Sequence, residues 1–152
     1  MIEIRDTAKD ASPHRVVEML ISCVAAGDLR AAYALYAENA HVSVEFEIPA
    51  RKDLVGTGGW PVALPRMYDD IKVQGLFIHQ TGNPDVVIAE WDYVSRIGTA
   101  EVVNSNIIVV QVQDGKIVRA RDYHNHVARA IANGQADTLI AKIRSMVLPV
   151  DR

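Results

Sequence analysis

The feature that most constrains the fold is a run of strand-like segments joined by very short turns. Residues 75–82, 86–96, 100–113 and 116–126 are apolar or alternating, and they predict three or four strands. The linkers between them, residues 83–85, 97–99 and 114–115, are rich in Asn, Asp, Gly and Pro. A crossover between parallel strands needs a dozen or more residues, so these linkers predict an antiparallel meander.

The segments before the meander predict helices and one further strand. Ser12 and Pro13 form a helix start, and the apolar residues that follow recur at helical spacing up to Gly27. Asp28 is placed to cap a second helix that ends within residues 38–40. Apolar and polar residues then alternate over residues 41–48, which predicts a strand.

The remaining segments predict a loop and two more helices. Residues 49–59 are rich in turn formers and predict a loop, and residues 61–70 predict a short helix. Near the C-terminus, residues 135–148 are expected to form a closing amphipathic helix. Its apolar stripe comprises Leu139, Ile140, Ile143 and Val147.

Length and composition bound the domain organisation and the partners. The 152 residues suit a single domain, residues 1–152, with a flexible N-terminus at residues 1–11. Nucleic acid is an unexpected partner for a chain with a net charge of −3. No leader-like or membrane-spanning segment is visible in the sequence, which favours a cytoplasmic protein without membrane contact.

The predicted fold class is α+β, with helices on the concave side of a cone-like curved antiparallel sheet that encloses an apolar pocket. Alternation along the last strand places Ala120, Asp122 and His124, together with Val118, opposite Arg119 and Arg121. The arginines belong outside, so Asp122 belongs inside. A carboxylate on an apolar face suits proton transfer. The alternative is a structural carboxylate, hydrogen-bonded to Tyr93 or to a backbone amide.

Six further residues are candidates for binding a substrate. Alternation places Trp91 and Tyr93 on the Asp122 face, where a flat apolar wall suits a planar ligand, although core packing is an equally good interpretation. His124 is placed to orient the substrate or tune the carboxylate, or to line the pocket rim without chemistry. The orientation of His79 is unresolved. Ser105 and Tyr36 complete the set, and neither a metal nor a cofactor is expected.

The segments AAGDLRAAYALYAENA and VVNSNIIVVQVQDGKIVRARDYHNH resemble the nuclear-transport-factor-two-like superfamily, and specifically its SnoaL-like enzymes. Residues 83–125 are similar to limonene epoxide hydrolase, and NPDVVIAEW and RDYHNH also resemble the phenazine-biosynthesis A/B proteins. In these relatives a carboxylate on the last strand does acid-base work, and Asp122 matches it. Trp91 and Tyr93 stand where the epoxide hydrolase pattern needs an arginine and a second aspartate, so its water-activating set is incomplete.

The resemblance implies a small cofactor-free enzyme of secondary metabolism that acts on a hydrophobic metabolite. Its chemistry would be polyketide cyclisation, isomerisation or epoxide opening, with Asp122 as the acid-base group. The alternative is a non-catalytic protein that binds a small molecule or serves as an accessory of a biosynthetic pathway. The resemblance also implies a homodimer through the outer sheet face, with Ile108 and Val110 as the apolar contacts.

Overall fold

The computed structural model describes residues 11–60 and 70–147, which form four helices and a six-stranded sheet. The elements are α1 (Pro13–Ala26), α2 (Leu29–Ala34), β1 (Tyr36–Val44), β2 (Lys52–Val55), β3 (Ile71–Gln80), β4 (Val86–Ile97), β5 (Ala100–Gln113), β6 (Lys116–His124), α3 (His126–Ala132) and α4 (Ala136–Val147). The predicted α+β class is confirmed.

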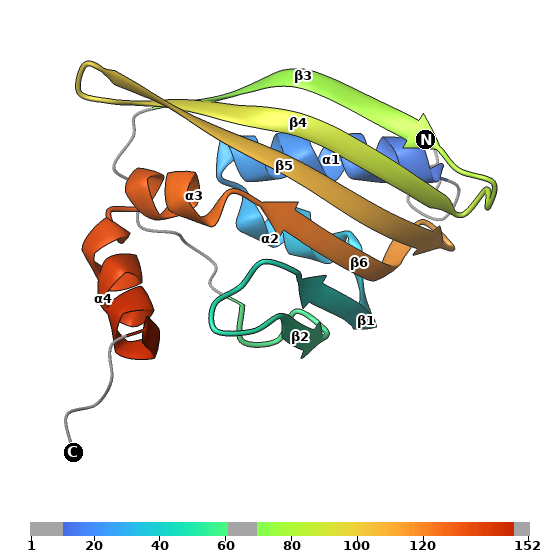
Figure 1. The fold of residues 1–152 in the computed structure, drawn as a ribbon. Coiled ribbons are helices and arrows are strands. Elements are labelled where there is room, and N and C mark those ends of the chain that lie inside the picture. The colour runs from blue at the N-terminus through green and yellow to red at the C-terminus, as the bar shows by residue number, and fades with distance from the viewer. Residues whose placement is uncertain (1–10, 61–69, 148–152) are drawn as a thin grey trace.

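The strands form one open sheet in the order β2-β1-β6-β5-β4-β3. The four strands from β3 to β6 make the predicted antiparallel meander, whereas β1 lies parallel to β6, so the sheet is mixed rather than wholly antiparallel. Helices α1 and α2 lie along one face of this sheet (Figure 1), where α1 contacts β3, β4 and β5. We call the face covered by α1 the inner face and the opposite one the outer face.

The core lies between α1 and the inner face. Apolar residues at helical spacing on α1 meet apolar residues at alternate positions of the strands, which is the pattern that buries one side of each element. The most deeply buried large side chains are those of Val16, Val17, Ile21, Val87, Val110 and Ile117. Ser12 caps α1 through its side chain, and Gly27 ends it with a left-handed backbone, both as predicted.

The second helix is shorter than predicted. It ends at Ala34, and the residues from Tyr36 onward belong to β1 instead of continuing the helix to residues 38–40. Strand β6 explains the difference, because the Ile117 amide donates to the Leu35 carbonyl (2.8 Å) and the Lys116 ammonium donates to the Ala34 carbonyl (2.6 Å). Long-range strand pairing here overrides local helix propensity.

Three other boundaries differ from the predictions. Strand β1 ends at Val44, so Phe46 lies beyond it and is 63% exposed. Strand β2 lies within the predicted loop and pairs with β1, and β3 begins at Ile71, four residues before the predicted start. The predicted helix at 61–70 falls almost wholly outside the described residues, as does most of the predicted flexible N-terminus.

The C-terminal part contains a helix that the sequence analysis missed. Strand β6 ends at His124, and the Asn125 side chain accepts from the Ala128 amide (3.0 Å), which caps α3. The predicted C-terminal helix is present as α4, although none of its residues is buried. Within the described ranges, no helix has both the length and the apolar character that a bilayer span requires.

Candidate functional site

Three buried polar or amphipathic side chains form a row across the inner face. The strand register places Trp91 on β4 beside Asn106 on β5, and Asn106 beside His124 on β6. Each is at most 8% exposed. Because residues in register on one face lie close together, these side chains line one continuous strip near the end of β6. The predicted inner position of Trp91 and His124 is confirmed.

Asp122 lies two residues before His124 on β6, so the two side chains share one face of the strand. Its side chain is 34% exposed, whereas the His124 side chain is 5% exposed, and the His124 Nδ1 lies 3.4 Å from Asp122 Oδ2. The other ring nitrogen, Nε2, lies 2.8 Å from a guanidinium nitrogen of Arg129 on α3. Asp122, His124 and Arg129 therefore form a line from an accessible carboxylate to a cation.

Tyrosines surround the carboxylate on the inner side. Burial raises the pKa of the Tyr36 hydroxyl far above its usual range, and the charge of Asp122 and the nearby Tyr93 and Tyr33 raise it further. Tyr36 therefore stays protonated and remains a hydrogen-bond donor close to Asp122. The Tyr93 hydroxyl donates to the Ile21 carbonyl (3.3 Å), and its ring meets Trp91 edge-on at 5.6 Å.

His126 continues the polar cluster toward the first strand. Its ring lies 4.1 Å from the His124 ring, and its Nδ1 lies 3.9 Å from Glu47 Oε2. The other carboxylate oxygen of Glu47, Oε1, lies 3.5 Å from the Lys142 ammonium of α4. Burial lowers the pKa of His126, and the neighbouring His124 lowers it further, whereas Glu47 raises it. Loss of solvent thus favours a neutral His126 beside His124.

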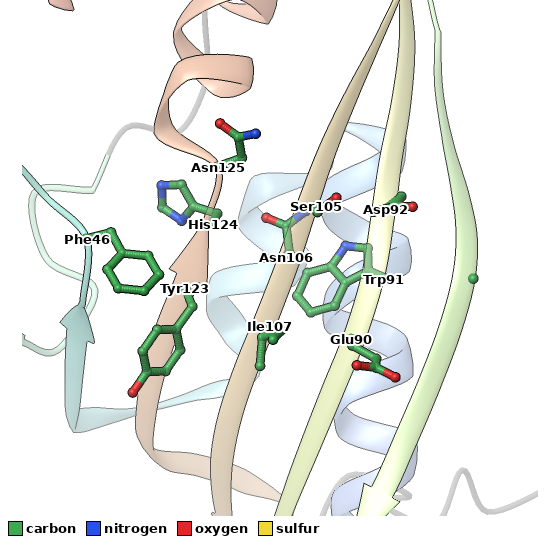
Figure 2. Close-up of a pocket in the computed structure, with 11 residues that line it drawn as sticks. Phe46, Glu90, Trp91, Asp92, Ser105, Asn106, Ile107, Tyr123, His124 and Asn125 are labelled. Atoms are coloured by element: carbon green, nitrogen blue, oxygen red, sulfur yellow. The ribbon is translucent and has the colours of Figure 1, made fainter.

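One pocket formed by the described residues opens on the outer face, whereas the sequence analysis predicted a pocket on the helix-covered side, which stays a prediction. It has a volume of about 470 Å³. Figure 2 shows its side chains around the strands, with α1 seen behind the sheet. Glu90, Ile107 and Tyr123 form one row in register, and the Phe46 ring meets Tyr123 edge-on at 5.4 Å. Trp91, Asn106 and His124 of the inner row are also among the residues that line it.

Two of the predicted substrate-binding residues lie away from Asp122. His79 is exposed on the outer side of β3, where its Nε2 lies 3.3 Å from Glu90 and its ring is tilted by 56° against the Phe77 ring, with 4.5 Å between the ring centres. Ser105 is exposed and lies in register with Asp92, on the outer face of β5. Neither side chain is placed to share a ligand with Asp122.

The predicted dimer contacts also need correction. Ile108 and Val110 are 4% and 0% exposed and belong to the core. Strict alternation along β5 instead turns Val103 and Ile107 outward, where they are 43% and 44% exposed.

Three buried polar atoms have no hydrogen-bond partner within the described part of the chain. They are Trp91 Nε1, Asn104 Oδ1 and His126 Nε2. An unsatisfied buried polar group costs roughly 1–3 kcal/mol, so each is a place where a ligand atom or a water would be stabilising. Among residues 11–60 and 70–147, no three His, Cys, Asp or Glu side chains converge as metal ligands would.

Sequence reasoning missed Arg129 and Asn106. Asn106 follows from the same alternation that places Ile108 and Val110 inside, so the sequence did contain its signal. Arg129 had no such signal, because its position depends on the unpredicted helix α3.

No protein-family model matches this chain, and no curated protein sequence matches it. Solved structures do share its fold. A candidate isomerase from Bacillus subtilis is 20% identical, with a TM-score of 0.62, over 81% of this chain and 93% of its own. A candidate polyketide cyclase from Pseudomonas putida KT2440 is 17% identical, with a TM-score of 0.61, over 81% and 98%. A phenazine biosynthesis-related protein from Pseudomonas aeruginosa is 19% identical, with a TM-score of 0.52, over 80% and 90%.

Proposed function

We propose that this protein is a cofactor-free enzyme that isomerises or cyclises an oxygenated hydrophobic metabolite, with Asp122 transferring the proton. The observation that carries the proposal is the position of Asp122. This carboxylate is one-third exposed on the helix-covered face, beside a buried histidine and close to a tyrosine that remains protonated. A base, a group that orients it and a hydrogen-bond donor are the parts that proton abstraction next to a carbonyl requires.

The proposed step balances without a co-reactant. The Asp122 carboxylate removes a proton from a carbon next to a substrate carbonyl, and the C–H electron pair moves into an enolate. The Tyr36 hydroxyl donates a hydrogen bond to the developing enolate oxygen. When the enolate is conjugated with a neighbouring C=C bond, its γ-carbon takes the proton back from Asp122, and the double bond moves to give an isomer. Otherwise the enolate carbon attacks an internal carbonyl to close a ring, and the oxygen of that carbonyl receives the proton from Asp122.

The inner face favours an oxygenated and largely apolar substrate. Trp91 and Tyr93 supply aromatic surface, and the partnerless Trp91 N–H is a donor that a carbonyl or hydroxyl oxygen would satisfy. The names of the structural neighbours, a candidate polyketide cyclase, a candidate isomerase and a phenazine biosynthesis-related protein, agree with a role in small-molecule biosynthesis. Their low identity makes this support an analogy of fold.

A panel assay tests the proposal. Purified protein would be incubated with poly-β-ketones, β,γ-unsaturated ketones and terpenoid epoxides, and products followed by chromatography with mass spectrometry. We expect an isomer or a cyclised product of at least one ketone, with incorporation of solvent deuterium at the carbon that exchanges its proton. Saturable binding of panel members without turnover or deuterium exchange would instead support the non-catalytic binding protein.

We also propose that two copies of the chain associate through their outer faces. The outer side of β5 presents exposed Val103 and Ile107, flanked by acidic Glu90 and Asp92 on β4 and basic Arg119 and Arg121 on β6. A two-fold axis parallel to β5 would lay β4 of one copy over β6 of the other. Each acidic strand would then face a basic strand, and the apolar strands would meet in the centre.

Replacing the central apolar contact should separate the copies. We expect wild-type protein to sediment as a dimer at micromolar concentration and Ile107→Glu as a monomer, because the change buries a charge at the contact. Val147→Glu, at a 73% exposed position on α4, is the control and should remain dimeric. Arg121→Glu should weaken the dimer and the double variant Glu90→Arg/Arg121→Glu should restore it. A monomeric wild type would contradict the proposal.

A further inference from the structure

The hydrogen bond from Arg129 determines which nitrogen of His124 carries the proton. Arginine has five N–H donors and no acceptor, and it remains charged at any physiological pH. Its 2.8 Å contact with His124 Nε2 is therefore a hydrogen bond only if Nε2 offers a lone pair. The single proton of the neutral ring must then lie on Nδ1, which is the nitrogen 3.4 Å from Asp122.

We infer that Arg129 is a positioning residue that holds His124 as the Nδ1–H tautomer, with the proton on the ring nitrogen that faces Asp122. This inference deepens the proposed function and rests on it for its catalytic meaning. The Nδ1 proton then lies on the side of the ring that faces Asp122, where Nδ1 and one carboxylate oxygen are 3.4 Å apart. The second oxygen is left for the substrate proton.

The surroundings of His124 support this arrangement from each element that contacts it. Asp122 faces Nδ1 from β6, Arg129 faces Nε2 from α3, and His126 stacks on the ring at the start of α3. Glu47 lies beyond His126, 3.9 Å from its Nδ1. Among these groups, the positively charged side chain in direct contact with His124 is that of Arg129. Because the His124 ring is buried, water has little access to replace Arg129 as its partner.

The inference explains why a strongly buried histidine stands between a carboxylate and a guanidinium. The His124 ring separates the Arg129 guanidinium from the Asp122 carboxylate, so these two charged groups do not form a direct ion pair. The imidazole lies between the two groups, and the Asp122 side chain remains 34% exposed. A direct bidentate pair would occupy both oxygens and leave no site for a substrate proton.

Nitrogen NMR of the substrate-free protein tests the inference without any assay of activity. In protein labelled with ¹⁵N-histidine at neutral pH, long-range ¹H–¹⁵N spectra distinguish a protonated from an unprotonated ring nitrogen. We expect His124, assigned through His124→Gln, to show protonated Nδ1 and unprotonated Nε2. In Arg129→Met the ring should shift toward the Nε2–H tautomer or a mixture, and Arg129→Lys should restore part of the wild-type pattern.

The control is Arg144→Met, which removes an exposed arginine from α4 and should leave the His124 signals unchanged. An Nε2–H or doubly protonated His124 in the wild type would overturn the inference, as would an unchanged tautomer in folded Arg129→Met. These outcomes are independent of the substrate panel. The expected tautomer together with no turnover would therefore contradict the proposed function alone.

Where a panel substrate is turned over, kinetics provide a second readout. We expect Arg129→Met to lower kcat by at least about 10-fold with little change in KM, as part of the roughly 10²–10⁴ that general acid-base catalysis supplies. Arg129→Lys should recover part of the loss. A change confined to KM would show that Arg129 contacts the substrate instead, and it would contradict the positioning role.

Discussion

Asp122→Asn should lower kcat by about 10² to 10⁴-fold while leaving ligand affinity nearly unchanged. The amide has almost the same size and shape as the carboxylate, so the packing on the inner face is retained. It cannot take a proton from a carbon acid, and it offers only a neutral oxygen to the His124 N–H. The measurement is steady-state turnover of a panel substrate together with calorimetric binding of the same compound.

The matched control for this variant is Asp92→Asn. Asp92 lies in register with Ser105 on the outer face, so the same chemical change is made on the other side of the sheet. We expect its turnover to remain within a few-fold of the wild type. Equal losses in the two variants would show that charge or folding, and not proton transfer by Asp122, controls the activity. Full turnover by Asp122→Asn would exclude it as the base.

The orientation of Asp122 followed from sequence because no bulge interrupts the last part of β6. From Arg119 to Asp122 the strand pairs without a register shift with both β5 and β1, so period-two alternation holds. Strand β4 pairs with β5 without a register shift, and the inward position of Trp91 was predicted correctly. In a strand without a bulge, the alternation of residue types therefore predicts correctly on which face of the sheet each side chain lies.

Irregular strands limited the rest of the prediction. The register between β3 and β4 shifts between Gln74 and Phe77, at a point where Gly75 has a left-handed backbone. One added residue reverses the faces, so Val73 and Ile78 both contact the core although they differ in parity. Alternation alone therefore could not determine that His79 points outward. A similar shift in β6 buries Ile117 in place of Val118.

Tyr36 and Arg129 show that the site depends on contacts between distant segments. Tyr36 fits a helical pattern in the sequence, but pairing with β6 draws it into β1 and brings it near Asp122. Arg129 reaches His124 because a single capping residue, Asn125, turns the chain from strand to helix immediately after β6. The sequence analysis predicted one continuous strand over residues 116–126. It therefore contained neither this turn nor the position of Arg129 beside His124.

Ile21→Ala should destabilise the protein by about 2–5 kcal/mol, because it removes a large side chain from the packed layer between α1 and the sheet. Ile21 is 1% exposed and belongs to the core cluster. The backbone carbonyl of the same residue accepts from Tyr93, so this position connects the core to the candidate site. The measurement is urea unfolding followed by far-ultraviolet circular dichroism.

Ile140→Ala is the matched control, since it makes the same substitution in a helix at a position that is 45% exposed. Helix propensity changes equally in the two variants, so the difference between their free energies of unfolding reports burial. We expect the control to cost less than about 1 kcal/mol. Equal effects would mean that α4 packs as tightly as α1 in solution. A small effect for Ile21→Ala would mean that α1 does not form the stable layer against which the proposed Asp122 site is built.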